Sequence, residues 1–343
     1  MKVVTVEKDV TIGYREVNKP RYNECQALVR TVACGMCGTD VKLIHRTFKG
    51  MGEEAYPIVL GHEAVGVVEA VGSKVTSFKV GDRVMLPAYL TDHENNPGLN
   101  SGWGGLAEYT VVCDPAAPWP EGVPGNAYAQ TVIDDDIDDL SAVMIITLRE
   151  VLSSIYSFGI QPEDSVVVYG TGPVGLTFIK FLSLLGVKDI IVCGRRKERL
   201  EEAAACGATH LINTREQDAK TAVKALFPPG VSYVLDAAGA PEVLNEGIKL
   251  LKDRGTVLCY GVPEKSQVTI DFTEAPYNWR VNYQQIPYKH EEGATHQQIL
   301  SWIREGKLDP RSFISDTFPL EQAAEAYQLM LEKKILKKGV ILF

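Results

Sequence analysis

A chain of 343 residues is longer than one compact core usually requires and suits two domains. The net charge of −9 argues against nucleic acid or an anionic membrane as the main partner, because both require a basic surface. No apolar run approaches the roughly 20 residues that span a bilayer, the first residues lack a signal-peptide pattern, and the seven cysteines form no disulfide framework. These features predict a cytoplasmic protein.

The first part of the chain is predicted to be rich in β-strands. Residues 27–32 and 64–68 are short apolar or alternating runs, and Gly81-Asp82 forms a turn before a further strand. The acidic stretch 134–139 is expected to be a solvated connection between domains.

From about Ser141 short apolar runs alternate with helical patterns. The predicted strands are 166–169, 189–193, 210–213, 231–235 and 256–260, and the predicted helices are 174–185, 196–205, 219–226 and 241–251. This alternation predicts a doubly wound parallel sheet. It stops after about Asp271, and the tail is too short for a domain of its own, so we expect the tail to complete the first domain. The tail has predicted helices near 296–305 and 320–333 and a last strand at 340–342.

A glycine-rich turn follows the first strand of this alternation and opens a helix. It consists of Gly170, Thr171, Gly172, Pro173, Val174 and Gly175. The pattern G-x-G-x-x-G in this context is the dinucleotide fingerprint, in which the glycines allow the tight turn, the approach of the backbone to the pyrophosphate and close helix–strand packing. The helix N-terminus then offers free N–H groups to the phosphates.

The end of the second strand of the alternation indicates which nicotinamide cofactor is preferred. An NAD site requires a carboxylate there to bind the ribose 2′-hydroxyl, but the chain has Gly194 followed by Arg195 and Arg196. Arginine can bind a 2′-phosphate with two parallel hydrogen bonds, and Arg215 beyond the third strand adds a further cation. Solvated helix charges are the alternative, although cations oppose the dipole at a helix start. We expect NADP(H) to be preferred over NAD(H).

Two fragments have the chemistry of a metal site. Cys34 and Cys37 are predicted to lie in a loop after a strand, and His62 opens the next strand. Thiolate and imidazole are ligands that Zn²⁺ prefers. A structural zinc knuckle requires a second C-x-x-C, which the chain lacks, and a redox C-x-x-C normally has a thioredoxin-like context. A buried pair of cysteines and a core histidine remain the structural alternatives.

Taken together, the chain resembles the zinc-containing medium-chain dehydrogenases, which include alcohol, sorbitol, threonine and glucose dehydrogenases. The resemblance covers nearly the full length and is carried by Cys37-Gly-Thr39-Asp40, Gly61-His62-Glu63-Ala-Val-Gly66, Gly81-Asp82-Arg83-Val84, the glycine-rich turn and Lys338-Gly-Val-Ile-Leu. It implies an α/β fold, with a GroES-like β-barrel catalytic domain over 1–140, completed by 281–343, and a Rossmann NAD(P)-binding domain over 141–280.

The resemblance also implies roles for individual residues. Cys37 and His62 would bind one catalytic zinc, and Glu63 matches a family glutamate that binds the zinc or stands behind its ligands. Thr39 matches the hydroxyl that passes the substrate proton, and Asp40 matches an aspartate that orients the imidazole.

Three departures from the family pattern affect the site. The place of a further zinc ligand falls at Ile146 or Thr147, neither of which is a good ligand, and Glu150 lies one turn further on. Glu63 is therefore the expected third ligand, with water as the fourth. Residues 86–112 contain no cysteine, so no structural zinc is expected.

The third departure concerns the proton relay and leaves its end open. Relatives often have a histidine where this chain has Lys42, so Lys42, solvent or His45 would end the relay.

The expected reaction is hydride transfer between NAD(P)(H) and a secondary alcohol, polyol or sugar. Polar and aromatic residues at 89–103 and 277–283 are candidates for lining a substrate pocket. A strand near 267–272 is a candidate for pairing between the subunits of a homodimer or homotetramer. Two alternatives stay open. One is a zinc-free quinone or enoyl reductase, and the other is a non-catalytic nucleotide-binding relative.

Overall fold

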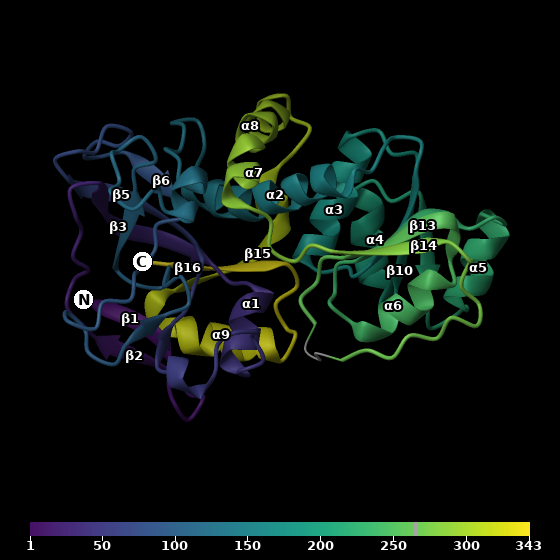
Figure 1. The fold of residues 1–343 in the computed structure, drawn as a ribbon, viewed down its shortest axis with the longest axis horizontal. Helices are drawn as coiled ribbons and strands as arrows, with labels where there is room; N and C mark the ends of the chain where they lie inside the picture. The colour runs from purple at the N-terminus through teal and green to yellow at the C-terminus, as the bar shows by residue number, and fades with distance from the viewer. Residues whose placement is uncertain (264–266) are drawn as a thin grey trace. The chain divides into compact units, whose positions relative to one another are not determined.

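The computed structural model describes residues 1–263 and 267–343. The chain forms two compact units, of which unit 1 comprises Met1–Arg149 and Tyr288–Phe343 and unit 2 comprises Glu150–Pro287. Both termini belong to unit 1 (Figure 1).

Unit 1 is built on two sheets. One has the order β15-β16-β3-β5-β6, with β8 also paired to β3, and the other has the order β2-β1-β4-β7. The strands are β1 Lys2–Val6, β2 Ile12–Glu16, β3 Gln26–Gly35, β4 Ile58–Val59, β5 Glu63–Val71, β6 Arg83–Met85, β7 Asn100–Ser101, β8 Tyr109–Cys113, β15 Ile314–Pro319 and β16 Lys338–Leu342. The last strand, β16, is antiparallel to β3, with Ile341 opposite Cys34. The C-terminal strand is thus an integral part of the sheet that carries Cys34.

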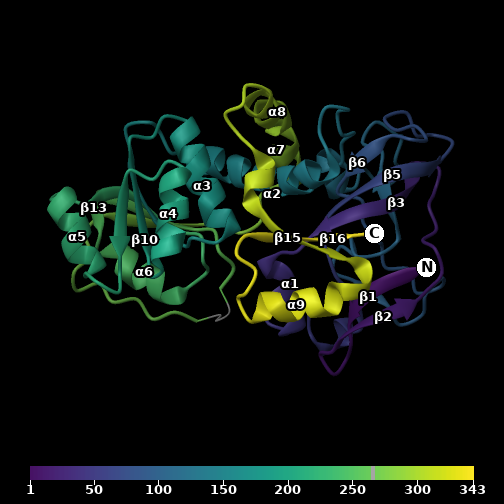
Figure 2. The ribbon, with the colours of Figure 1, turned by 180° about the vertical axis from the view of Figure 1, so that it is seen from behind.

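Helices of unit 1 close its core. They are α1 Gly38–Ile44, the first part of α2 Asp139–Phe158, α7 Lys289–Ala294, α8 His296–Arg304 and α9 Ala323–Leu331, with short 3₁₀ turns at Glu53–Ala55, Gly125–Ala129, Pro310–Phe313 and Leu320–Gln322. Helices α1 and α9 lie side by side in both views (Figures 1 and 2). Leu43 of α1 and Tyr327 of α9 share one buried apolar cluster with Cys34, so the cluster joins the N-terminal sheet to the C-terminal tail.

One carboxylate, Asp114, fixes the turn that follows β5. Its two oxygens accept hydrogen bonds from the backbone N–H and hydroxyl of Thr76 and Ser77, and from the N–H of Ala116. Burial alone raises the pKa of Asp114, but the Ser77 hydroxyl and the N–H groups outweigh it and lower that pKa to about 2.

Replacing this carboxylate is expected to destabilise the protein in a pH-dependent way. Asp114→Asn should reduce the free energy of unfolding at pH 7 by about 2–3 kcal/mol, because N–H donors lose a charged acceptor. The lowered pKa means that the stabilisation is present above the ordinary value of 3.8 and is lost as the pH falls toward about 2. Denaturant unfolding should show the difference narrowing over that range. A difference that persists at pH 2, or an equal effect of replacing the exposed Asp135 with Asn, would contradict the assignment.

We expected the acidic stretch before α2 to be a solvated connection, but three of its carboxylates bind arginine side chains. Both Asp134 and Asp136 accept hydrogen bonds from Arg304, and Asp138 accepts two from Arg311. These exposed ion pairs connect the stretch to the C-terminal part of unit 1. The sequence separation of about 170 residues hid the partners from sequence reasoning.

Unit 2 is a six-stranded parallel sheet with the order β11-β10-β9-β12-β13-β14. The strands are β9 Ser165–Tyr169, β10 Asp189–Gly194, β11 His210–Asn213, β12 Val231–Asp236, β13 Leu251–Cys259 and β14 Trp279–Tyr283. The helices are α3 Pro173–Leu184, α4 Lys197–Ala205, α5 Ala219–Leu226 and α6 Pro241–Ile248. The alternation of strands and helices predicted for this region is confirmed.

Three local features differ from what the sequence predicted or lie beyond it. Residues 267–272 form no strand within the single chain, where Val268 and Ile270 pack against the buried cluster of unit 2; the pairing of this segment between subunits stays a prediction. The parallel sheet has a further strand beyond Asp271, because β14 pairs with β13. The segment after Cys37 is the helix α1 rather than a loop, and Cys34 lies within β3.

Helix α2 is long and apolar enough by length and composition to cross a membrane, although we expected no such segment from the sequence. However, 78% of its apolar window is buried within the structure. Buried core helices share this length and composition, so helix α2 is weak evidence for a membrane span.

Candidate metal centre and cofactor site

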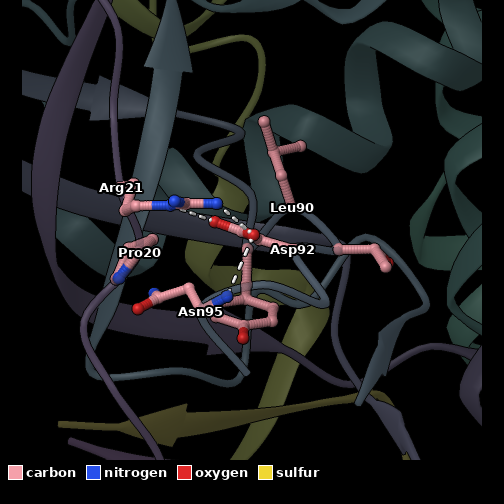
Figure 3. Close-up of a pocket in the computed structure, with 7 residues that line it drawn as sticks. Pro20, Arg21, Leu90, Asp92 and Asn95 are labelled. Atoms are coloured by element: carbon pink, nitrogen blue, oxygen red, sulfur yellow. Dashed lines mark hydrogen bonds and ion pairs between the residues drawn. The ribbon is translucent and has the colours of Figure 1, made fainter. Parts of the chain in front are cut away.

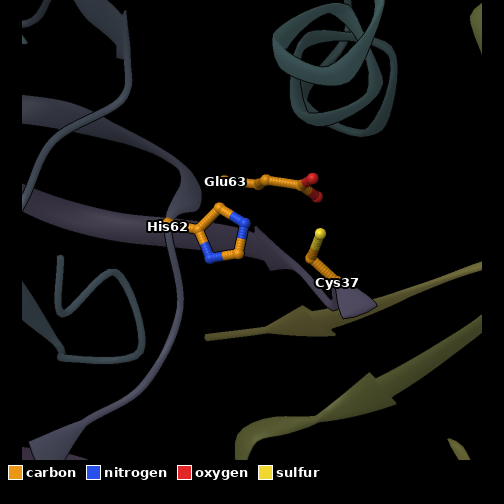
Figure 4. A group of neighbouring side chains, drawn as sticks. All are labelled: Cys37, His62 and Glu63. Carbon is orange, nitrogen blue, oxygen red and sulfur yellow. The ribbon is translucent and has the colours of Figure 1, made fainter. Parts of the chain in front are cut away.

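Three side chains of unit 1 meet where β3, α1 and β5 adjoin. Cys37 precedes the first residue of α1, His62 immediately precedes β5, and Glu63 is the first residue of β5. The thiol sulfur, an imidazole nitrogen and a carboxylate oxygen all lie within 4.8 Å of one another. Figure 4 shows the sulfur of Cys37 and the carboxylate of Glu63 on the same side of the imidazole ring.

Gly61 allows this meeting. Its φ of +88° is in the left-handed region, and a Cβ there would lie 2.8 Å from the sulfur of Cys34 and from the backbone nitrogen of Leu106. Only glycine therefore lets the chain turn so close to β3 and place His62 beside Cys37.

The fully buried Asp40 contacts two of the candidate ligands, Cys37 and His62. Its Oδ2 accepts hydrogen bonds from the N–H of Cys37 (3.0 Å) and the hydroxyl of Tyr327 (2.9 Å), and its Oδ1 lies 3.4 Å from Nδ1 of His62. Burial opposes ionisation of Asp40, but its hydrogen-bonding and charged neighbours outweigh burial, so its pKa lies below the ordinary value. A carboxylate beside Nδ1 favours the imidazole form whose other nitrogen is free to bind a metal.

Glu63 belongs to a buried group that sequence reasoning did not find. The ammonium of Lys338, on β16, lies 2.7 and 2.5 Å from the two oxygens of Glu63, and both side chains are almost completely buried. The hydroxyl of Thr147, on α2, lies 2.9 Å from Oε1 of Glu63 and 2.9 Å from the ammonium. Glu63 and Lys338 are 275 residues apart in the sequence. The sequence analysis therefore identified Lys338 only as part of the tail motif and assigned it no role at the site.

The structure distinguishes among the other candidate ligands. Thr147, rather than Ile146, has its side chain against Glu63. Glu150 belongs to unit 2 and accepts a hydrogen bond from the hydroxyl of Tyr260. Burial raises the pKa of the Cys34 thiol well above its ordinary value, so Cys34 remains a protonated core residue.

The remaining relay candidates lie on or beside α1. Thr39 is half-buried in the first turn, Lys42 is half-buried in the last turn, and His45 is exposed at the end of the helix. The donor set itself fits zinc, because thiolate, imidazole and carboxylate all bind Zn²⁺, and three protein ligands leave the fourth position of a catalytic site open.

The glycine-rich turn of unit 2 joins β9 to α3. Gly170 has a φ of +111°, and a Cβ on Gly175 would lie 1.9 Å from the carbonyl oxygen of Gly170, so the fold itself requires both glycines. A Cβ on Gly172 would meet nothing within 4 Å. The packing of unit 2 leaves open space at Gly172, as a backbone approached by a pyrophosphate requires. Thr171, Pro173 and Val174 complete the turn and begin α3 with Pro at its first position.

Exposed cations follow β10. Gly194 ends that strand, Arg195 and Arg196 precede α4, and Arg215 follows β11, all three arginines being exposed. Arg199 lies in the first turn of α4, and the sequence analysis did not identify it as a candidate cofactor-binding residue. It is 7% exposed, and its Nε has no hydrogen-bond partner among the described residues. Burial and the charge of Arg196 lower the pKa of Arg199.

A cavity of about 190 Å³ lies in unit 1 beside the loop that was expected to line a substrate pocket (Figure 3). It is lined by Pro20, Arg21, Tyr89, Leu90, Thr91, Asp92 and Asn95. None of the three candidate metal ligands lines it, and Asp92 is already bound by Arg21 and by the N–H of Asn95. Of the other predicted lining segment, Tyr277 and Tyr283 are highly exposed.

Comparison with known proteins agrees with this geometry. The alcohol dehydrogenase GroES-like domain family matches residues 23–120, and the zinc-binding dehydrogenase family matches residues 173–288. Sorbitol dehydrogenase of Bacillus subtilis (strain 168) is 27% identical over 97% of this chain and 94% of its own, and starvation-sensing protein RspB of Escherichia coli (strain K12) is 30% identical over 96% and 95%. Alcohol dehydrogenase TADH from Thermus sp. ATN1 superposes with a TM-score of 0.78 at 27% identity, covering 100% of this chain and 99% of that chain.

These matches confirm the predicted family and the α/β fold of a GroES-like and a Rossmann-type domain. The family also provides the coarse chemistry, which is the reaction of a small alcohol with a nicotinamide cofactor on a zinc-type enzyme. The chain therefore belongs to the zinc-type medium-chain dehydrogenase/reductase family and is an alcohol or polyol dehydrogenase.

Proposed function

We propose that Cys37, His62 and Glu63 hold one catalytic zinc ion and that this chain oxidises secondary alcohols, polyols or sugars, or reduces the matching carbonyls. The observation that carries the proposal is the meeting of three different donor atoms within 4.8 Å. Unit 1 would be the catalytic part and unit 2 the NAD(P)-binding part. We also propose a cytoplasmic homodimer or homotetramer with no structural zinc, since residues 86–112 contain no cysteine.

When bound, zinc would supply a Lewis acid that makes the alcohol hydroxyl more acidic, and the nicotinamide would accept the hydride from the carbinol carbon. Asp40 holds the imidazole of His62 in the orientation for binding, and Lys338 with Thr147 positions the carboxylate of Glu63. Thr39 receives the hydroxyl proton and passes it toward Lys42, His45 or solvent. The alcohol thus loses one proton and one hydride and becomes a carbonyl compound.

A panel of alcohols tests this function. Zinc-loaded protein should reduce NADP⁺ with at least one secondary alcohol, polyol or sugar, and removal of zinc by a chelator should abolish that activity. Retained activity without metal would favour the zinc-free reductase alternative. Stoichiometric zinc with no oxidation of any compound would favour a non-catalytic relative.

We propose further that NADP(H) is the preferred cofactor. No carboxylate stands at the end of β10, where Gly194 is followed by two arginines. Arg195, Arg196 and Arg215 supply exposed guanidinium groups, and Arg199 adds a buried one whose Nε lacks a partner among the described residues. A 2′-phosphate would satisfy cations that otherwise repel one another at a helix start.

Removing these charges should affect one cofactor selectively. In an Arg195→Ala, Arg196→Ala double variant, the KM for NADP⁺ is expected to rise about 10- to 100-fold, because charge-assisted bonds to the 2′-phosphate are lost. The KM for NAD⁺ should stay nearly unchanged, since NAD⁺ has no phosphate there. Steady-state kinetics with both cofactors checks this, and equal losses for both would contradict the assignment. Lys188→Ala, on the turn before β10, serves as a control for the loss of a cation near this strand.

A further inference from the structure

A tyrosine of the C-terminal tail contacts the carboxylate that lies behind the candidate metal ligands. Tyr327 belongs to α9 and is completely buried, and it shares one apolar cluster with Leu43 and Ile44 of α1. Its hydroxyl donates a hydrogen bond of 2.9 Å to Oδ2 of Asp40, although the two residues are 287 positions apart in the sequence. A buried tyrosine hydroxyl requires a partner, and here the partner is a buried carboxylate rather than a backbone carbonyl.

The two oxygens of Asp40 have different surroundings. Oδ2 accepts one hydrogen bond from the N–H of Cys37, at the start of α1, and one from the hydroxyl of Tyr327, on α9. Oδ1 has no hydrogen-bond partner among the described residues, and the same is true of Nδ1 of His62, which lies 3.4 Å from it. The carboxylate is therefore fixed at one oxygen, and its other oxygen faces the imidazole.

The hydroxyl of Tyr327 helps to define the plane of this carboxylate. Hydrogen bonds to an sp² oxygen prefer the plane of its group, so two donors on Oδ2 restrict rotation about the Cβ–Cγ bond more than one donor does. Without the hydroxyl, Oδ2 would keep only the N–H of Cys37, and Oδ1 would no longer be directed at His62. Loss of the group that binds the second nitrogen of a ligating imidazole weakens metal binding about 10- to 100-fold.

We propose that Tyr327 is a positioning residue of the metal centre, which acts through Asp40 on the imidazole of His62. This role rests on the proposed function, because it requires His62 to be a metal ligand. Cys37, His62 and Glu63 lie close together in the sequence, yet their affinity for the metal then depends on α9, near the other end of the chain. A purely structural tyrosine would contribute to stability alone.

Tyr327→Phe, with Tyr56→Phe as its matched control, tests this role without reference to activity. Tyr56 is buried in the same apolar cluster and its hydroxyl also donates to α1, but to the carbonyl of Leu43. Each change removes one oxygen atom from a buried ring, so both variants should fold and lose stability to a similar extent in denaturant unfolding. Only Tyr327→Phe should weaken Co²⁺ binding, by about 10-fold, in a chelator competition followed by the visible absorption of the bound ion.

Replacement of Asp40 shows whether Tyr327 acts through it. Asp40→Ala should itself weaken Co²⁺ binding about 10- to 100-fold, and the addition of Tyr327→Phe should cause no further loss. Wild-type affinity in Tyr327→Phe, an equal loss of affinity in Tyr56→Phe, or an undiminished effect of Tyr327→Phe in the Asp40→Ala background would overturn the proposal.

Failure of the metal site itself has a different outcome. Wild-type protein that binds no Co²⁺, or Co²⁺ binding that is unchanged in Cys37→Ala, would reject the proposed metal site and, with it, the role of Tyr327. Tight Co²⁺ binding that depends on Cys37 but not on Tyr327 would reject the role of Tyr327 alone.

Discussion

A Cys37→Ala variant is expected to lose its zinc and to reduce kcat/KM for alcohol oxidation by more than about 1,000-fold, while still binding NADPH as the wild type does. Cys37 supplies the thiolate of the candidate trio. Without it, one imidazole and one carboxylate remain, and these would hold zinc weakly. The cofactor should be unaffected, because its proposed site lies in the other unit. Metal analysis, NADPH titration and turnover measure the three quantities separately.

Cys34→Ala provides the matched control for this result. Cys34 is only three residues away but is a buried core thiol within β3 and lies outside the candidate trio. The control variant should therefore lose some stability and retain its zinc. A Cys37→Ala protein with full zinc content, or a Cys34→Ala protein without zinc, would show that the trio is assigned incorrectly.

Lys338→Met is expected to make the stability of the protein depend on zinc. In zinc-depleted protein, the variant leaves the buried carboxylate of Glu63 without its cation, which should reduce the free energy of unfolding by about 3–5 kcal/mol. Zinc binding to Glu63 supplies a replacement positive charge, so added zinc should restore much of this loss. Zinc should consequently stabilise the variant more than the wild type.

Denaturant unfolding with and without zinc measures this coupling. Lys337→Met is the control, because this neighbouring lysine is only half-buried and its ammonium donates to the carbonyl of Ser312. The control should reduce the free energy of unfolding by about 1 kcal/mol, and by the same amount with and without zinc. Equal stabilisation of wild type and Lys338→Met by zinc would contradict a role of Glu63 as a metal ligand.

The sequence was sufficient where local chemistry decides the structure. The alternation of strands and helices predicted the parallel sheet of unit 2, and the glycine pattern predicted the turn between β9 and α3, where Gly175 has no space for a side chain. The candidate trio followed from two short motifs, since Cys37 lies in the segment after one predicted strand and His62 opens the next.

Contacts between distant segments were not predictable in the same way. The pairing of Lys338 with Glu63 depends on β16 lying beside β3, which no local pattern specifies. Near Val268 the sequence suggested a strand, whereas within the single chain this residue packs against the core of unit 2, because packing against a core can produce the same apolar pattern as strand pairing. The hydrogen bond from Tyr327 to Asp40 was also invisible, since the two residues are 287 positions apart in the sequence.

X-ray absorption at the zinc edge of the purified, zinc-loaded protein tests the central claim most directly. The proposed ligands predict a single sulfur at about 2.3 Å and nitrogen or oxygen neighbours at about 2.0–2.2 Å, with one zinc per chain. The Cys37→Ala variant should give no sulfur neighbour. Zinc bound by nitrogen and oxygen alone in the wild type, by two or more sulfurs, or no zinc at all would contradict the account.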